Sequence, residues 1–196
     1  MIKRLFDIIA ASLGLVLLSP LLLLVSLLIR LDSPGPALFR QERMGRGFRP
    51  FFIYKFRTMV QEAPGQGGLI TFGADPRITR VGRILRKTKI DEFPQLINVL
   101  KGEMSLVGPR PEVRRYVEMF RDAYEEILQV PPGITDLASL KYRHEAEVLG
   151  CAANPEEAYV RHVLPEKLQL AKEYVRRSSL LFDVTLILKT LLKLFR

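Results

Sequence analysis

An uncharged apolar run near the N-terminus constrains this chain more than any other feature. No residue from Ile8 to Ile29 carries a charge. As an α-helix, a segment of this length would reach about 33 Å, roughly the thickness of the hydrocarbon core of a bilayer. A cleaved signal peptide has a shorter apolar run and a small-residue cleavage site, and the sequence LLIRLDSPG is a poor one. We therefore expect residues 1–32 to form a permanent membrane segment.

Ser19 and Pro20 lie at the midpoint of this run. Proline removes one backbone hydrogen bond and clashes with the preceding turn, so we expect a kink, with the Ser19 hydroxyl bonded to a freed carbonyl. Basic residues flank both ends: Lys3, Arg4, Arg30, Arg40, Arg43, Arg46 and Arg49. A re-entrant helix-break-helix hairpin keeps both basic ends on the cytoplasmic side, and a straight span does not. An ordinary kinked transmembrane anchor is the alternative.

The charge balance and the cysteine content bound the rest of the chain. Among 196 residues, 30 are Lys or Arg and 21 are Asp or Glu, giving a formal charge of +9. This excess predicts an anionic partner: nucleic acid, a phosphorylated metabolite or an anionic membrane face. The single cysteine, Cys151, cannot form an internal disulfide. We expect residues 33–196 to form one membrane-associated domain on the cytosolic side.

The pattern of this domain predicts an α/β fold with a small β-sheet and several amphipathic interfacial helices. Two short strands are expected between Ala37 and Met59, around a turn at Gly45–Gly47. Helices are expected at Ile78–Lys87, Phe93–Leu100, near Val113–Leu128, and at Pro155–Arg177 with an interruption near Pro165. A strand is expected within the segment ITDLASLKY. The apolar tail, residues 178–196, fits a core helix or an interfacial one equally well.

Two adjacent carboxylates, Asp91 and Glu92, stand in the basic stretch KTKIDEFPQL. Pro94 suits the first turn of a helix, so both carboxylates should lie at or just before a helix N-terminus, where capping is the common role. Cations surround them in sequence: Arg83, Arg86, Lys87, Lys89 and Arg110. Arginines clamp phosphate oxygens, and a carboxylate can hold a hard cation or attack phosphorus. The constellation therefore also fits a phosphate-rich substrate.

Several motifs, in order, give the chain a specific resemblance. They are KRLFD, the Ser19-Pro20 helix, YKFRTM, DPRITRVGRILRKTKIDEFPQLINVLKGEMSLVGPRPE and PPGITDLAS. Together they resemble the bacterial sugar transferases known as monotopic phosphoglycosyl transferases. The resemblance implies that Asp91 attacks the β-phosphorus of a nucleoside diphosphate sugar, usually a UDP-sugar, with Glu92 as its partner. UMP is released, and polyprenyl phosphate, such as undecaprenyl phosphate, then takes the phosphosugar. This would be the first membrane step of a glycoconjugate or exopolysaccharide pathway.

The same resemblance implies a cofactor and further site residues. Mg²⁺ is the expected cofactor, with Asp91 as its ligand. The expected phosphate-binding residues are Lys55, Arg86, Arg110 and Arg143, with Arg57 as a weaker candidate; for each, a solvated surface cation is the alternative. Ser19 and Pro20 are expected to set a monotopic hairpin on the cytoplasmic face of the bacterial inner membrane. The expected partners include membrane lipids but no nucleic acid, and homo-oligomers are allowed.

Some residues depart from the family pattern or fit no role. DLASLKYRHEAEVL follows the PGIT turn where many relatives have GxAQVNGRN, and Ala171 stands where many have Asp. These departures leave the sugar open. His144, Glu145 and Glu147 are interpreted as a polar helix face and not a metal cluster. The rival hypothesis is a non-catalytic, basic, membrane-tethered binding or scaffold protein, which does not explain carboxylates among arginines.

Overall fold

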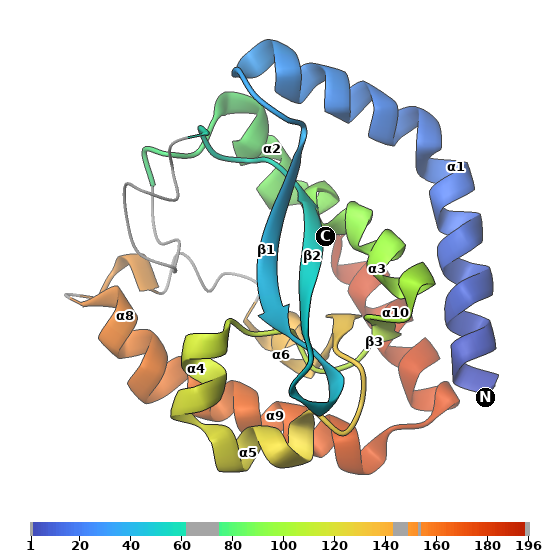
Figure 1. Cartoon of the computed structure of the whole chain (residues 1–196), viewed down its shortest axis with the longest axis vertical. Coiled ribbons are helices and arrows are strands. Elements are labelled where there is room, and N and C mark those ends of the chain that lie inside the picture. The colour runs from blue at the N-terminus through green and yellow to red at the C-terminus, as the bar shows by residue number, and fades with distance from the viewer. Residues whose placement is uncertain (1, 62–74, 143–148, 153, 195–196) are drawn as a thin grey trace.

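Helices make up most of the protein, and they surround two small sheets (Figure 1). The computed structural model describes residues 2–61, 75–142, 149–152 and 154–194. In chain order the elements are α1 (Ile2–Asp32), β1 (Leu38–Met44), η1 (Arg46–Phe48), β2 (Pro50–Phe56), α2 (Arg80–Thr88), η3 (Ile90–Gln95), α3 (Leu96–Lys101), β3 (Ser105–Val107), α4 (Arg114–Met119), α5 (Arg121–Ile127), β4 (Gly133–Thr135), α6 (Leu137–Lys141), α8 (Pro155–Ala158), η4 (Tyr159–Val163), α9 (Leu164–Arg177) and α10 (Leu180–Leu194).

The apolar N-terminal run forms one continuous helix, α1, with Pro20 inside it. Figure 1 shows that this helix bends along its length. Pro20 cannot donate to the carbonyl of Val16, and the Ser19 hydroxyl donates to that carbonyl at 2.8 Å. The expected role of the Ser19 hydroxyl is confirmed. The expected kink agrees with this bend. The helix is not interrupted at Ser19 and Pro20, because the hydroxyl compensates for the lost bond, so the expected helix-break-helix form is not confirmed.

One side of α1 packs on the protein and the other side is bare. Val25 and Ile29 lie in a hydrophobic cluster with Ala37, Phe56 and Leu85. The opposite side exposes large apolar residues: Ile9, Leu13, Val16, Leu17, Leu23, Leu24, Leu27, Leu28 and Leu31. Among the described residues, α1 is the one helix long and apolar enough to cross a membrane. Its bare side suits contact with lipid.

Two charged residues at the start of α1 fasten it to distant elements. Asp7 is buried, and its carboxylate accepts hydrogen bonds from the Ser105 hydroxyl at 2.8 Å and the Leu106 N–H at 3.1 Å. Lys3 forms an ion pair with Asp183 of α10. From the sequence, Asp7 is expected to cap the helix or to pair with Lys3 or Arg4. This expectation is wrong, because the Asp7 carboxylate binds strand β3.

The strands β1 and β2 form the predicted hairpin. They pair antiparallel, with Leu38 opposite Phe56 and Met44 opposite Pro50, and η1 supplies the turn. Phe51 and Ile53 of β2 are buried, and together with Ala11 of α1 they form a second hydrophobic cluster. The hairpin is therefore held against the membrane helix.

A second sheet joins β3 and β4 in parallel, with Ser105 opposite Gly133 and Val107 opposite Thr135. The strand expected in ITDLASLKY begins at Gly133 and ends at Thr135, because Asp136 caps a helix there by accepting from the Ser139 N–H at 2.7 Å. The single helix expected near residues 113–128 is instead two, α4 and α5.

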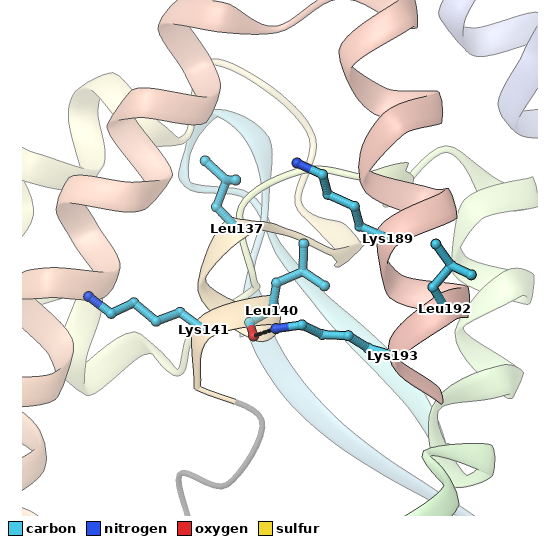
Figure 2. A pocket seen from close by; sticks show the side chains of 6 residues that line it. All are labelled: Leu137, Leu140, Lys141, Lys189, Leu192 and Lys193. Carbon is cyan, nitrogen blue, oxygen red and sulfur yellow. Dashed lines mark hydrogen bonds between the residues drawn. The ribbon is translucent and has the colours of Figure 1, made fainter. Parts of the chain in front are cut away.

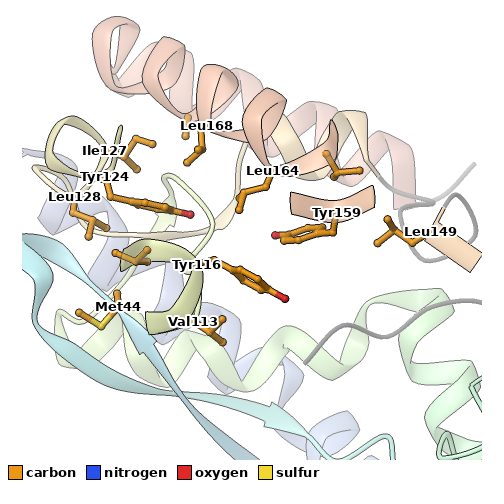
Figure 3. Close-up of a cluster of buried hydrophobic side chains, with 13 residues drawn as sticks. Met44, Val113, Tyr116, Tyr124, Ile127, Leu128, Leu149, Tyr159, Leu164 and Leu168 are labelled. Atoms are coloured by element: carbon orange, nitrogen blue, oxygen red, sulfur yellow. The ribbon is translucent and has the colours of Figure 1, made fainter. Parts of the chain in front are cut away.

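The largest hydrophobic cluster lies between α4, α5, η4 and α9 (Figure 3). The rings of Tyr116 and Tyr159 meet there with their centroids 5.3 Å apart. The helical segment from residue 155 to 177 is interrupted, as expected, by the π-type turn η4, and Pro165 follows in the first turn of α9. Pro165 suits that position because it has no N–H to donate.

The C-terminal helix α10 combines features of a core helix and of an interfacial helix, the two alternatives that the sequence left open. Leu186 and Asp183 are buried against the protein, whereas Leu181, Leu188 and Leu192 are exposed. A pocket lies between α6 and α10 (Figure 2). Its lining consists of three leucines and three lysines: Leu137, Leu140, Leu192, Lys141, Lys189 and Lys193. None of the predicted phosphate-binding residues belongs to this lining.

Candidate active site

The two adjacent carboxylates lie in the short 3₁₀ turn η3, between α2 and α3. Lys89 has a left-handed backbone (φ 60°), which ends α2 and redirects the chain into η3. Pro94 lies inside η3, and α3 begins after it and ends at Gly102 (φ 84°). Asp91 and Glu92, called the dyad below, thus lie in the first turn of η3, which leads directly into α3. Their expected place at or just before a helix N-terminus is confirmed, although helical structure begins at Ile90 and not near Phe93.

Glu92 is held by two cations. Its Oε1 lies 2.9 Å from Lys55 Nζ and 2.5 Å from Arg110 Nη2, and its Oε2 accepts from Arg110 Nη1 at 3.3 Å. Burial raises the pKa of Glu92, but Arg110 and Lys55 outweigh it, and the pKa lies well below its ordinary value. Glu92 is therefore an anion fixed between β2 and the segment after β3. It does not cap a helix.

Asp91 is buried beside this ion pair but has no such partner. Its exposed fraction is 8%, and within the described part of the chain its Oδ1 is buried without a hydrogen-bond donor. Burial and the charge of Glu92 raise the pKa of Asp91, against the opposing effect of Lys55, Lys89 and Arg86. A carboxylate in this state has an available lone pair and raised basicity. Both properties suit a nucleophile or a metal ligand.

Lys55 reaches Glu92 because an asparagine fixes its strand. Asn98 of α3 is fully buried; its Oδ1 accepts from the Tyr54 N–H at 3.0 Å, and its Nδ2 donates to the Phe52 carbonyl at 2.7 Å. The side-chain amide thereby occupies the edge of β2 that β1 leaves free. Burial lowers the pKa of Lys55, and the carboxylate of Glu92 opposes this effect.

Arg86 approaches the dyad from α2. Its Nε donates to the Thr58 hydroxyl at 2.8 Å, and burial lowers its pKa, against the charge of Asp91. Gly82 allows α2 to lie this close to the chain, because a Cβ at Gly82 would stand 2.1 Å from the Thr58 carbonyl oxygen. The Thr79 hydroxyl caps the helix by accepting from the Gly82 N–H at 3.0 Å.

Arg110 comes from the segment that follows β3. Its backbone N–H donates to Asp136 Oδ2 at 3.2 Å, which ties this segment to the start of α6. About a third of the Arg110 side chain is exposed. Arg110 is therefore more accessible from solvent than Lys55, whose side chain is 20% exposed.

The remaining predicted residues lie elsewhere. Arg57 is buried, and its guanidinium donates to the Ile29 carbonyl of α1 at 3.4 Å and to the Ser33 carbonyl, just after α1, at 2.8 Å. Arg143, like His144, Glu145 and Glu147, lies outside the described residues. Ser19 and Pro20 lie within α1, as described above. The structure thus brings Asp91, Glu92, Lys55, Arg86 and Arg110 together, and it gives Arg57 a contact with the membrane helix.

The side chains that could ligate a metal determine which ion the site could hold. Among the described residues, no three carboxylate, histidine or cysteine side chains form a cluster that could hold an ion. Both Glu92 oxygens are engaged by cations, which leaves the buried, unpartnered Oδ1 of Asp91. Mg²⁺ is commonly held by one or two carboxylates together with substrate phosphates. Asp91 is therefore the residue of this site that could supply a carboxylate to such an ion.

Two residues that support the site are not predicted from the sequence. The sequence offers one signal for Asn98: asparagine is unfavourable in the interior of a helix, so its presence there suggests a specific hydrogen-bond partner for its side chain. Thr58 follows the predicted Arg57 directly, but its role depends on Arg86, which is 28 residues away in sequence.

Nearly the whole chain is similar to known bacterial proteins. A family model described as bacterial sugar transferase matches residues 1–196. The chain is 42% identical to UDP-N-acetylgalactosamine-undecaprenyl-phosphate N-acetylgalactosaminephosphotransferase of Aeromonas hydrophila, over 97% of this chain and 43% of that protein. It is 41% and 37% identical to two proteins named UDP-glucose:undecaprenyl-phosphate glucose-1-phosphate transferase: that of Caulobacter vibrioides (96% of this chain, 67% of the relative) and that of Escherichia coli K12 (100% and 40%). The chain thus spans less than half the length of two of these relatives.

Proposed function

The chain belongs to the bacterial sugar transferase family, and we propose that it transfers a sugar-1-phosphate from a UDP-sugar to undecaprenyl phosphate. The three relatives described above carry names that state this kind of transfer. The product would be an undecaprenyl-diphosphate-linked sugar, which begins the assembly of a polysaccharide or glycoconjugate. The names differ in the sugar, N-acetylgalactosamine or glucose, so the proposal covers the class of donor.

The observation that carries the proposal is the buried Asp91 Oδ1, which has no hydrogen-bond donor among the residues that the structure describes. A basic binding or scaffold protein needs no such group, because a buried carboxylate without a donor is costly and would repel an anionic ligand. A phosphoryl-transfer enzyme needs an oxygen nucleophile that is not already bonded to a cation. Asp91 meets this requirement, and Glu92, held by Lys55 and Arg110, does not.

We propose a reaction in two displacements. An Asp91 carboxylate oxygen attacks the β-phosphorus of the donor, the bond between this phosphorus and the bridging oxygen breaks, and UMP leaves with the electron pair. An oxygen of the acceptor phosphate then attacks the same phosphorus, and the bond to Asp91 breaks to regenerate the carboxylate. No oxidant or reductant is required, and each displacement exchanges one phosphorus–oxygen bond for another.

In this proposal the cations position the phosphates, and Glu92 positions the cations. Arg110 offers a fork of donors from a partly exposed side chain, and Lys55 and Arg86 offer charge at a buried site. Placing charge in advance supplies most of the catalysis in phosphoryl transfer. Glu92 stays ionised because its pKa lies below the ordinary value, so its role is electrostatic anchoring and not proton transfer. Mg²⁺, held by Asp91, would neutralise charge on the diphosphate.

We further propose that α1 enters the bilayer and returns to the same, cytoplasmic, face. Exposed apolar side chains cover one side of α1, and its bend lies in the middle of the apolar run. Its two ends are fastened to the same folded body, through Asp7 to β3 and through Asp32, which accepts from the Val81 N–H of α2 at 3.0 Å. The fastening of both ends to one folded body supports their placement on the same side of the membrane.

The decisive test measures UMP release from UDP-sugars by protein in detergent, with undecaprenyl phosphate and Mg²⁺ present. Asp91→Asn keeps the shape of the side chain but removes the anionic nucleophile, and we expect turnover to fall by at least about 1000-fold. Asp122→Asn, the same substitution at an exposed residue of α5, is the matched control and should retain activity. Intact-mass spectra without acceptor should show a phosphosugar adduct on the parent protein. Equal turnover by Asp91→Asn would refute the proposal.

A further inference from the structure

The outward side of α2 carries a row of cations around an exposed isoleucine. Arg80, Arg83, Ile84 and Lys87 are spaced i, i+3, i+4 and i+7, so they share one side of the helix. All four are exposed, and 64% of Ile84 is accessible. Within the part of the chain that the structure describes, no carboxylate forms an ion pair with any of the three cations. We call these four residues the α2 basic face.

The α2 basic face differs from the cations of the active site. Arg86 belongs to the same helix but points inward, to the Thr58 hydroxyl. Some other exposed cations of the protein are paired with nearby carboxylates, such as Arg161 with Glu157 at 2.9 Å and Arg177 with Glu173 at 2.6 Å. A row of unpaired cations repels itself, which is a cost unless an anionic surface lies against it.

The position of α2 indicates which anionic surface lies against its basic face. Its N-terminus is joined to the end of α1 by the bond from the Val81 N–H to Asp32, and Leu85 packs in one cluster with Val25 and Ile29 of α1. The uncharged run of α1 ends at this point, so Asp32 lies at the level of the lipid headgroups. The nine residues of α2 span about 13 Å. Whatever the tilt of α2, its first turns lie within about one Debye length, roughly 8–10 Å, of that level.

We propose that the α2 basic face docks on anionic phospholipid headgroups of the bilayer, with Ile84 inserted between them. Charge complementarity selects this occupant, and an isoleucine surrounded by cations is the pattern of an interfacial helix. The contact would fix the height of the helix that carries Arg86 and precedes the dyad. The lipid composition of the bilayer would thereby affect the position of Arg86 in the active site, although no lipid enters that site.

A fluorescent label at position 84 tests this proposal without any use of enzymatic activity. The full chain with Cys151→Ser and Ile84→Cys is labelled with an environment-sensitive dye and reconstituted into vesicles that contain headgroup-nitroxide lipid. One set of vesicles is phosphatidylcholine, a second adds phosphatidylglycerol, and a third adds a trace of undecaprenyl phosphate. Met119→Cys, at an exposed residue of α4, is the control label site.

We expect quenching at position 84 to rise on addition of phosphatidylglycerol, and quenching at position 119 to stay unchanged. Each cation near an anionic membrane strengthens the contact roughly fivefold, so Arg83→Gln with Lys87→Gln should lower the ratio of docked to undocked protein about 25-fold. Arg46→Gln with Arg49→Gln removes two exposed cations at the far end of the β1–β2 hairpin and should change nothing.

Three results would overturn the proposal. Quenching at position 84 that is equal in neutral and anionic vesicles would show that charge plays no part. Quenching that survives Arg83→Gln with Lys87→Gln would show that other groups hold the helix at the surface. Quenching that requires the undecaprenyl phosphate and not phosphatidylglycerol would assign the α2 basic face to the acceptor. None of these results depends on whether Asp91 is the nucleophile.

Discussion

Replacing Asn98 should reveal how far one buried amide holds the active site together. Asn98→Ala leaves the Tyr54 N–H and the Phe52 carbonyl without their partner at the free edge of β2. It also removes the donor to Glu103 Oε2 at 2.7 Å. Each buried polar group left unpaired costs about 1–3 kcal/mol, and alanine returns about 0.5 kcal/mol through its better helix propensity. The net loss in the free energy of unfolding is therefore about 3 kcal/mol.

Thermal unfolding in detergent, followed by far-UV circular dichroism, measures this loss. For a chain of this size 1 kcal/mol shifts the melting temperature by about 2–4 °C, so Asn98→Ala should melt about 6–12 °C lower. Asn98→Asp keeps the acceptor for Tyr54 but sets a negative charge against Phe52 O and Glu103, and it should be at least as unstable. Lys101→Ala, in the same helix and also in contact with Tyr54, is the control and should melt like the parent protein. A shift below about 2 °C for Asn98→Ala would refute the reasoning.

Three other substitutions address neighbouring contacts. Gly82→Ala should destabilise the protein by about 2 kcal/mol or more, measured by its melting temperature, because the new Cβ meets the Thr58 carbonyl oxygen and neither backbone can move freely. Asp7→Ala should cost about 2 kcal/mol in the same assay, since it leaves two donors on β3 unpaired. Arg110→Lys should raise the KM for the donor sugar about tenfold in a UMP-release assay, because lysine cannot form the fork of bonds that Arg110 directs at Glu92 and, in the proposed function, at a donor phosphate. An unchanged KM would exclude Arg110 from donor binding.

The features predicted correctly from the sequence are those that neighbouring residues determine. The β1–β2 hairpin follows from its turn and from the aromatic and β-branched residues of β2, whose buried side fixes the register. Helix α2 was expected at residues 78–87 and found at 80–88, because Thr79 caps it and its apolar positions share one side. The hydrogen bond from Ser19 to Val16 is also local, since it spans a single helical turn.

The features that the sequence did not predict depend on residues far apart in the chain. The partner of Asp7 is 98 residues away at Ser105, and the helices α4 and α5 separate at a point that no proline or glycine marks. The candidate site shows the same division. The carboxylate pair is visible in the sequence, but its asymmetry is not. Only the fold brings Lys55 and Arg110 to Glu92 and leaves Asp91 Oδ1 without a hydrogen-bond donor in the described part of the chain.

This asymmetry explains why the two adjacent carboxylates can differ in function while sharing one turn. Two carboxylates this close cannot both be ionised at low cost unless cations compensate them. Lys55 comes from β2, and Arg110 comes from the segment after β3. Both strands are fastened to α1. Strand β2 packs on it through the cluster of Phe51, Ile53 and Ala11, and β3 is hydrogen-bonded to Asp7. The membrane helix therefore holds the two cations that keep Glu92 ionised, and the charge of Glu92 in turn raises the basicity of Asp91. It follows that a domain lacking α1 would still contain both carboxylates, but Lys55 and Arg110 would no longer be held at Glu92. The difference in pKa between Asp91 and Glu92 would then be reduced.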